Sequence, residues 1–202
     1  MKVLPIKYEE TKDWLLNVHY MKRMPPMNYA FGLFDDGECL GIMTFGVPAS
    51  PNLCEGICGK EWKDSVFELN RMVFANPVKN GPSRLFSGAT KLLPQPMIIV
   101  SYADTEYGHV GKVYQACNFI YTGLSAKRNN YVDGSGRHAR EIKKTDVMEE
   151  RSRKHRYVYI NANKSDKKKI MSALKYKIEP YPQGTPNRYE INHRPTTQGS
   201  LL

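Results

Sequence analysis

The apolar run "MIIV" at residues 97–100 is the feature that most restricts how this chain can fold. An unbroken run of this length, bounded by polar residues and prolines, is typical of a strand buried inside a sheet. Asp104 follows at its polar end, and α/β proteins often place reactive groups there. The next residues, 105–123, crowd glycines, a histidine and several aromatic rings into one stretch. The simpler interpretation is a strand, a turn and a core helix without chemistry.

Length and composition favour one α/β domain. The chain has 202 residues, 41% of them hydrophobic, which is enough apolar material for a core. No apolar run is long enough to cross a membrane, and residues 1–10 lack the apolar stretch of a secretory signal. We therefore expect an intracellular protein without a membrane segment.

The four cysteines are Cys39, Cys54, Cys58 and Cys117. Cys54 and Cys58 have a spacing that zinc could use, but no second pair of ligands stands at a suitable distance along the chain. We expect reduced, structural thiols.

The excess of positive over negative charge is confined to one part of the sequence. Residues 1–126 contain 12 Lys and Arg against 12 Asp and Glu, whereas residues 127–202 contain 18 against 8. The second part therefore carries the whole net charge of +10, with tyrosines between its basic residues. This pattern is typical of a nucleic-acid-binding surface, and a solvated basic tail is the alternative.

The basic part subdivides by composition. "KSDKKKIMSALK" at 164–175 predicts a short basic helix, while the Pro, Gly and polar residues beyond 182 predict an extended or disordered end. We therefore expect a core at 1–126, a basic extension at 127–182 that completes the domain and contacts DNA, and a flexible tail at 183–202.

The expected elements follow the order strand, helix, hairpin, strand, helix, strand, helix, strand. Asp35-Asp36-Gly37 is a strong hairpin signal, and Cys54 and Cys58 are expected in a loop. The element ranges, with connecting loops included, are 3–8, 9–21, 29–46, 65–74, 75–93, 97–103, 109–118 and 119–125. This order resembles the GNAT acyltransferase fold, an α/β (α+β) fold with a mixed twisted sheet flanked by helices.

The GNAT resemblance implies a cofactor site beside the strand that ends near Phe74. In that fold this strand splays from its neighbour, and the following loop presents amides to the cofactor pyrophosphate. Here the loop is "VKNGPSRLFSGA", and it departs from the usual pattern because Pro82 has no amide to offer. Asn80 and Ser83 could still cradle an anion of acetyl-CoA or another acyl donor, or they could cap the helix without any ligand.

A more specific resemblance rests on four segments and their order. They are "HYMKRMP" at 19–25, "ELNRMVF" at 68–74, "SYADTEYGHVGKVYQACNFIYTG" at 101–123 and "KHRYVYI" at 154–160. Together they resemble the Mom family of bacteriophage DNA-modification proteins. The resemblance implies an enzyme that converts adenine in double-stranded phage DNA to an N6-methylcarbamoyl form, in the host cytoplasm, and so protects it from restriction. It also implies iron as a cofactor and does not identify the group donor.

Asp104 and Tyr114 are the expected catalytic residues. Asp104 would position or deprotonate the adenine amine, and its alternative role is to cap the next turn. Tyr114 would donate to a developing oxyanion or stack on the extruded base, and its alternative is a place in the core. Gln115 has the amide geometry to pair with adenine.

The resemblance places the family's His-Tyr pair at His19 and Tyr20, and imidazole and phenolate are plausible ferric ligands. A histidine at the end of a helix can also act simply as a cap. Arg71 is expected to hold a phosphate or the donor group, and Glu68 to ligate a metal or lie exposed. Three residues apart on a strand, these two would lie on opposite faces.

We expect phosphate contacts from five basic residues: Lys154, Arg156, Lys167, Lys168 and Lys169. The sequence leaves open whether the chain forms a homodimer. Two other functions also remain open: a GNAT acetyltransferase that acts on a protein or small-molecule amine, and a DNA-binding phage protein without catalysis.

Overall fold

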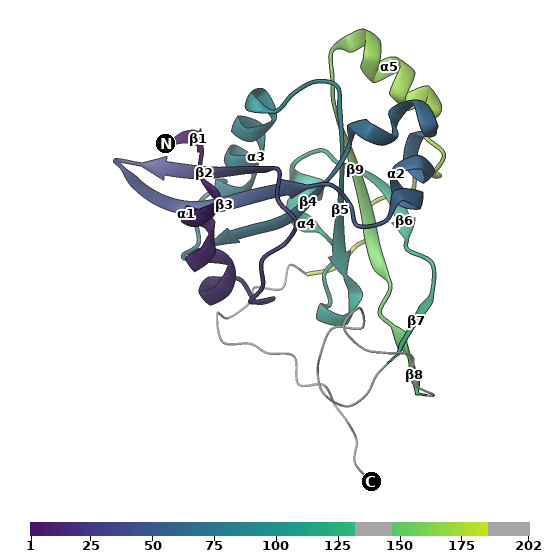
Figure 1. The fold of residues 1–202 in the computed structure, drawn as a ribbon, viewed down its shortest axis with the longest axis horizontal. Helices are drawn as coiled ribbons and strands as arrows, with labels where there is room; N and C mark the ends of the chain where they lie inside the picture. The colour runs from purple at the N-terminus through teal and green to yellow at the C-terminus, as the bar shows by residue number, and fades with distance from the viewer. Residues whose placement is uncertain (132–146, 186–202) are drawn as a thin grey trace.

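A seven-stranded mixed sheet forms the centre of the computed structural model, which describes residues 1–131 and 147–185 (Figure 1). The strand order is β1-β2-β3-β4-β5-β9-β6. In that order the strands are Lys2–Pro5, Tyr29–Asp35, Glu38–Gly46, Val66–Phe74, Met97–Asp104, Lys154–Asn161 and Ile120–Leu124. A separate pair, β7 (Arg128–Tyr131) and β8 (Met148–Arg151), projects from one end. The expected α/β architecture is confirmed.

Five α-helices pack on the described part of the sheet. They are α1 (Tyr8–Asp13), α2 (Pro51–Cys58), α3 (Gly81–Leu92), α4 (Lys112–Ala116) and α5 (Lys164–Ala173). A π-helical turn at Trp14–Val18 continues α1, and 3₁₀ turns occupy Lys60–Ser65 and Thr105–Tyr107. The helix expected at 109–118 is thus shorter than its sequence pattern. None of the helices in the described ranges is long and apolar enough to cross a membrane.

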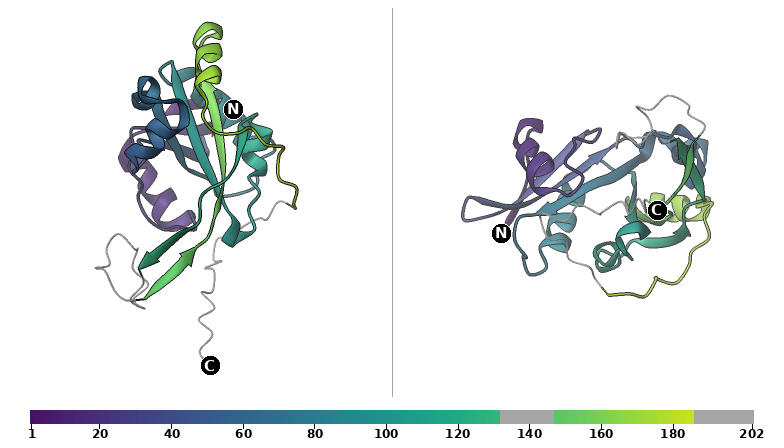
Figure 2. Two further views of the ribbon diagram at one scale, coloured as in Figure 1. Left: turned by 90° about the vertical axis from the view of Figure 1, so that its right-hand side faces the viewer. Right: turned by 90° about the horizontal axis from the view of Figure 1, so that it is seen from below.

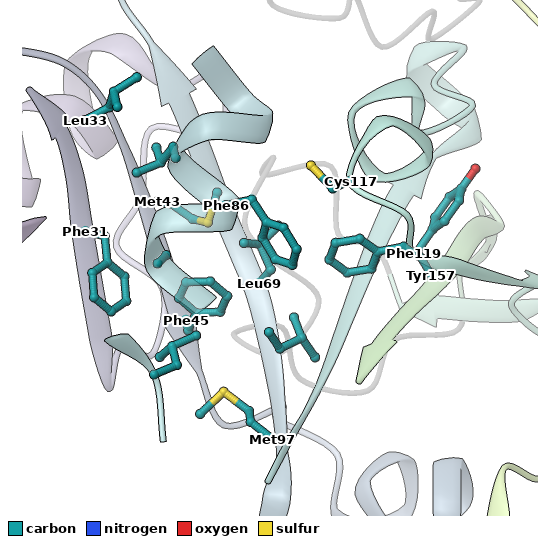
Figure 3. Packing of buried hydrophobic residues seen from close by; sticks show 14 of the residues in the cluster. Phe31, Leu33, Met43, Phe45, Leu69, Phe86, Met97, Cys117, Phe119 and Tyr157 are labelled. Atoms are coloured by element: carbon teal, nitrogen blue, oxygen red, sulfur yellow. The ribbon is translucent and has the colours of Figure 1, made fainter. Parts of the chain in front are cut away.

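The apolar run in β5 is buried on both faces of the sheet, as its composition predicts. Met97 and Ile99 join the cluster under α3, which includes Phe45, Leu69 and Phe86 (Figure 3). Ile98 and Val100 face the opposite way and pack with residues of α2 and α5. Successive side chains of β5 therefore pack into two different hydrophobic clusters, one on each face of the sheet.

The parallel pair β4 and β5 separates soon after it forms. The ladder joins Val66, Phe67 and Glu68 to residues 98–100, and the Ser101 hydroxyl then donates to the Leu69 carbonyl at 2.9 Å. Beyond this point β4 runs toward the side of the molecule while β5 continues along β9 (Figure 1). The splay predicted near Phe74 is confirmed, and we call the gap between the two strands the sheet opening.

The basic segment supplies a strand to the sheet. β9 lies between β5 and β6, antiparallel to both, with Asp104 opposite Lys154 and Met97 opposite Asn161. The strand β9, which comes from the basic segment, therefore completes the sheet.

Cys54 and Cys58 lie in α2, which corrects the loop expected there. Pro51 stands at the start of this helix, where its missing amide costs nothing. Both thiols are free and buried against Ile57 and Val66, and burial raises the pKa of Cys58 to about 11. Within the described residues no three His, Cys, Asp or Glu side chains converge as a metal group. Burial of both thiols in the core supports the structural role that the sequence predicts for them.

Gly111, one of the glycines that follow Asp104, is required by the local backbone and packing. It starts α4 with φ of +70°, and a Cβ there would come within 2.5 Å of the Tyr157 ring. Tyr157 in turn donates to the Val110 carbonyl at 2.5 Å and accepts from the Gln115 amide at 3.2 Å. The glycine thus allows the turn to seat on β9.

We predict that Gly111→Ala destabilises the protein more than Gly37→Ala. Gly37 has φ of +86°, and no atom lies within 4 Å of the point that a Cβ would occupy, so its substitution adds only backbone strain, about 1 kcal/mol. Gly111→Ala adds the clash with Tyr157 to the same strain. Thermal melting of both variants measures the difference, and equal melting temperatures would contradict this packing.

Candidate active site

The sheet opening gathers side chains from four parts of the chain. His19 and Tyr20 come from the end of the first helix, Arg71 from β4, Asp104 from β5 and Tyr114 from α4. The charges of Arg71 and Asp104 both act on the Tyr20 phenol, and Tyr20 and Arg71 both interact with Tyr114. The structure thus brings together five of the predicted site residues.

Asp104 is largely buried and accepts several hydrogen bonds. Its Oδ1 accepts from the Ser152 hydroxyl at 2.6 Å and from the Glu106 amide at 3.2 Å, and its Oδ2 forms an ion pair with Lys154. Burial alone would raise the pKa of Asp104, but the bonds from Lys154 and Ser152 outweigh it and hold the pKa below its ordinary value. Asp104 is therefore ionised at neutral pH and is a weak base.

The capping role considered for Asp104 is present as well. The Glu106 amide that it accepts belongs to the 3₁₀ turn that begins at Thr105. Capping uses one of the two carboxylate oxygens. A carboxylate offers about four acceptor sites, and the three bonds leave room for one further donor.

Tyr114 points from α4 toward the strands. Its ring packs against Phe119 and Tyr157, with centroids 5.4 and 5.3 Å away, as expected of a core tyrosine. Its hydroxyl lies 3.5 Å from the Tyr102 carbonyl and interacts with Ser101 at the sheet opening. Burial raises the pKa of Tyr114 to about 12, so the hydroxyl keeps its proton at neutral pH and can donate.

A β-bulge brings Arg71 to the same face of β4 as Glu68. Pairing with β3 shifts between Leu69 and Arg71, which leaves Asn70 as an extra residue and reverses the alternation beyond it. The Glu68 charge acts on Arg71, so the expectation that the two lie on opposite faces is wrong. Asn70 holds the bulge because its side chain accepts from the Thr44 hydroxyl at 2.6 Å and donates to the Pro26 carbonyl at 2.7 Å.

Arg71 carries an unsatisfied donor. Its Nη1 donates to the Asn70 carbonyl at 2.6 Å, but its Nε is buried without a hydrogen-bond partner among the described residues. Burial and the charge of Arg23 lower the pKa of Arg71, although a guanidinium stays protonated at neutral pH. A buried, unpaired guanidinium nitrogen is costly unless an acceptor arrives.

His19 and Tyr20 stack on each other, with ring centroids 4.5 Å apart, and Tyr107 meets Tyr20 edge-on at 5.3 Å. Burial, aided by the Arg71 charge, lowers the pKa of His19 to about 3, so the imidazole is neutral. Its Nδ1 accepts from the Met21 amide at 3.1 Å. Burial raises the pKa of Tyr20, so the phenol is protonated.

This pair has donor types that ferric iron accepts, but the structure does not preorganise them. Because Nδ1 accepts a hydrogen bond, the neutral ring carries its proton on Nε2. An ion at Nε2 would move that proton to Nδ1 and break the Met21 bond, and an ion on Tyr20 would displace the phenol proton.

Three other predicted residues lie away from the sheet opening. The Gln115 amide donates to the carbonyls of Val110 and Pro182 and to Tyr157, so it is occupied in the fold. Asn80 and Ser83 line a hollow along α3 and β1 whose other residues include Met1 and Lys91. In the first turn of α3 the Gly81 amide donates to Val78 and Pro82 has none, which leaves few donors for an anion.

The predicted DNA-binding residues divide between two ends of the sheet. Lys154 pairs with Asp104, and Arg156 donates to Thr122 and stacks on Tyr176 with its guanidinium carbon 3.4 Å from the ring centroid. Lys167, Lys168 and Lys169 are on α5, which follows the far end of β9 (Figure 1). Eight residues of strand separate them from Asp104, roughly 25 Å.

Sequence reasoning missed Ser152 as a partner of Asp104 and assigned Lys154 to DNA phosphates instead of to this carboxylate. Ser152 and Lys154 lie about fifty residues beyond it, and only the register of β5 with β9 brings them to the carboxylate. Asn70 was also missed, although its place inside a β-rich run is a weak signal for a bulge.

Solved structures with similar architecture are acetyltransferases. An aminoglycoside 6'-N-acetyltransferase from Enterococcus faecium has 10% identity and a TM-score of 0.48, covering 81% of this chain and 99% of its own. An N-acetyltransferase from Staphylococcus aureus Mu50 has 16% identity and a TM-score of 0.46, covering 79% and 97%. Likeness at this level says nothing about chemistry.

Sequence comparison is more specific. The methylcarbamoylase Mom of Escherichia phage Mu is 28% identical over 205 aligned residues, which cover 88% of this chain and 84% of that protein. The model of the Mom protein family matches residues 1–183, which include every side chain placed at the sheet opening. This chain belongs to the Mom protein family.

Proposed function

We propose that this chain is a transferase that moves a methylcarbamoyl-type group to the N6 amine of adenine in phage DNA, which would protect that DNA from host restriction. Its family and its methylcarbamoylase relative support the group and the class of reaction. One structural observation carries the proposal: an ionised carboxylate, Asp104, and a protonated phenol, Tyr114, both interact with the Tyr20 phenol at the sheet opening. The ionised Asp104 can accept a hydrogen bond from the substrate, and the protonated Tyr114 can donate one.

Asp104 orients the amine in this mechanism. An exocyclic adenine amine is a poor nucleophile, and a hydrogen bond to a carboxylate increases the electron density on nitrogen. Because Lys154 and Ser152 keep the pKa of Asp104 low, accepting this bond suits it better than removing the proton outright. Lys154 also keeps the carboxylate in place through the ion pair.

Tyr114 stabilises the oxygen of the transferred group. When the amine attacks the carbonyl carbon, a C–N bond forms, negative charge develops on the oxygen, and a hydroxyl donor nearby lowers the barrier. The bond to the donor's leaving group then breaks and the amine loses a proton. The adenine must leave the duplex to react, and the rings of Tyr20 and Tyr107 offer a surface on which it can stack.

Arg71 is the proposed contact for the group donor. Its unpaired Nε and the nearby charge of Arg23 suit a carboxylate or phosphate on the donor molecule. Asn80 and Ser83 lie at the start of α3, away from the sheet opening, so they would contact only a distant anionic part of the donor, and Pro82 reduces what a CoA pyrophosphate could receive there. A donor that binds mainly through Arg71 fits these residues better than acetyl-CoA.

Iron, if bound, would be held by His19 and Tyr20. It would act as a Lewis acid near the reacting groups. The neutral imidazole is in the state that a metal requires, whereas the Tyr20 phenol must first lose its proton.

Nucleosides from plasmid DNA tell the candidate functions apart. We expect mass spectrometry, after expression of this chain, to show adenosine with a methylcarbamoyl group and no such nucleoside with an empty vector. An acetylated amine in place of modified adenine would support the acetyltransferase alternative, and unmodified DNA would contradict the proposal.

Asp104→Asn and Lys154→Gln separate catalysis from the ion pair. Both break the same pair, so both should lower the melting temperature. Asp104→Asn also removes the negative charge beside the adenine amine, and we expect modification to drop by roughly 10²-fold or more, the scale of a lost electrostatic contact to the reacting group. Lys154→Gln should retain much more activity. Equal loss of modification in both variants would reduce Asp104 to a structural role.

Iron binding at Tyr20 should depend on pH. Because the ion displaces the phenol proton, ferric iron added to the protein should give a stronger tyrosinate charge-transfer band at pH 8 than at pH 6. Tyr20→Phe should abolish the band, whereas the matched Tyr107→Phe should keep it. A band that survives Tyr20→Phe, or no band at either pH, removes iron from this pair.

A further inference from the structure

The β7–β8 pair forms an exposed two-stranded arm beside the candidate active site. It continues the β6–β9 ribbon past the edge of the main sheet and projects away from the body of the molecule (Figure 2). All four residues of β8 are exposed. The two strands pair with each other and with no other described strand.

Two arginines stand directly opposite each other on this arm. Arg128 of β7 is the register partner of Arg151 of β8, and like charges at that position destabilise a ribbon. Glu150 does not relieve them, because it lies on the other face and pairs with Lys127 at 3.2 Å. Glu149 shares the face of Arg151 one pleat further out. An anion bound between the arginines would turn this repulsion into attraction.

The root of the arm is tied to the candidate catalytic carboxylate. Ser152 and Lys154, which follow β8, are the residues that bond to Asp104. Between them the Arg153 carbonyl accepts from the backbone amide of Thr105 at 3.2 Å and from its hydroxyl at 2.6 Å. The position of Arg151 is therefore fixed relative to Asp104, three residues of strand away, roughly 10 Å.

We propose that the β7–β8 arm lies in a groove of the substrate duplex, with Arg128 and Arg151 on backbone phosphates next to the adenine being modified. The proposal rests on the proposed function for its choice of DNA as partner. A two-stranded ribbon fits the major groove, and paired guanidinium groups suit phosphate oxygens. The lysines of α5 lie at the far end of β9 and cannot take this place.

The test compares equal charge changes at the two ends of the sheet. One variant combines Arg128→Gln with Arg151→Gln, and the matched control combines Lys167→Gln with Lys168→Gln. Fluorescence anisotropy with a labelled duplex gives the dissociation constant over a range of salt concentrations. Circular dichroism gives the melting temperature of each variant.

Loss of two phosphate contacts should lower the slope of log affinity against log salt by about 2 and weaken binding on the order of tenfold. The control should change both quantities much less. The melting temperature of the arm variant should stay unchanged or rise, because the substitution removes a like-charge pair.

The binding measurement tests the arm independently of the proposed function, because it does not require that adenine be modified. If the wild type binds duplex DNA through the arm but leaves adenine unmodified, the proposed modification activity is wrong and the proposed DNA contact of the arm is supported. If the arm variant has the affinity and the salt slope of the wild type, the proposal that the arm contacts DNA is wrong. It is also wrong if size-exclusion chromatography shows a concentration-dependent dimer that disappears in the arm variant while DNA binding persists, because the exposed strands would then serve a second copy.

Discussion

The parallel pairing of β4 with β5 lasts three residues, and the position where it stops determines the rest of the site. Up to Glu68 and Val100 the two strands share a ladder, and beyond it the Ser101 hydroxyl closes the pairing on the Leu69 carbonyl. Separated strands expose backbone and side-chain groups that a continuous sheet would cover. Arg71 and Asp104 both lie beyond that point, one on each strand, and Tyr114 reaches the gap from α4.

The two charged side chains of the sheet opening differ in how completely their hydrogen bonds are made. Asp104 accepts three bonds, whereas Arg71 keeps a buried Nε without a partner among the described residues. A fold optimised only for stability would pair or remove such a group. The imbalance is consistent with a site in which the carboxylate is held ready and the guanidinium awaits an anionic ligand. The bulge at Asn70 holds Arg71 in this position. The Asn70 side chain also bonds to the Pro26 carbonyl, in the loop that follows His19 and Tyr20.

Lys154 links three features of the molecule. It is the first residue of β9, the ion-pair partner of Asp104, and the end of the short connection from the exposed arm. A positive charge that appears in the sequence to belong to a basic surface is therefore used internally. Arg156 behaves similarly, bonded to Thr122 and stacked on Tyr176. Net charge along the chain thus overstates how much positive charge lies free on the surface.

The sequence by itself determined the features that arise within single elements. The apolar run at 97–100 specified a buried strand, Asp35-Asp36-Gly37 specified a hairpin whose Asp36 and Gly37 both have positive φ, and Asp104 was placed at a strand end. These follow from side-chain alternation and turn chemistry over a few residues. Only the tertiary structure decided which distant residues meet. Placement of β9 between β5 and β6, the pairing of Lys154 with Asp104, and the meeting of Glu68 with Arg71 all depend on strand register. Register is set by contacts between segments that a local pattern does not encode, and one extra residue at Asn70 reverses every side chain beyond it. The residue types of the site were therefore readable in the sequence, whereas their partners were not.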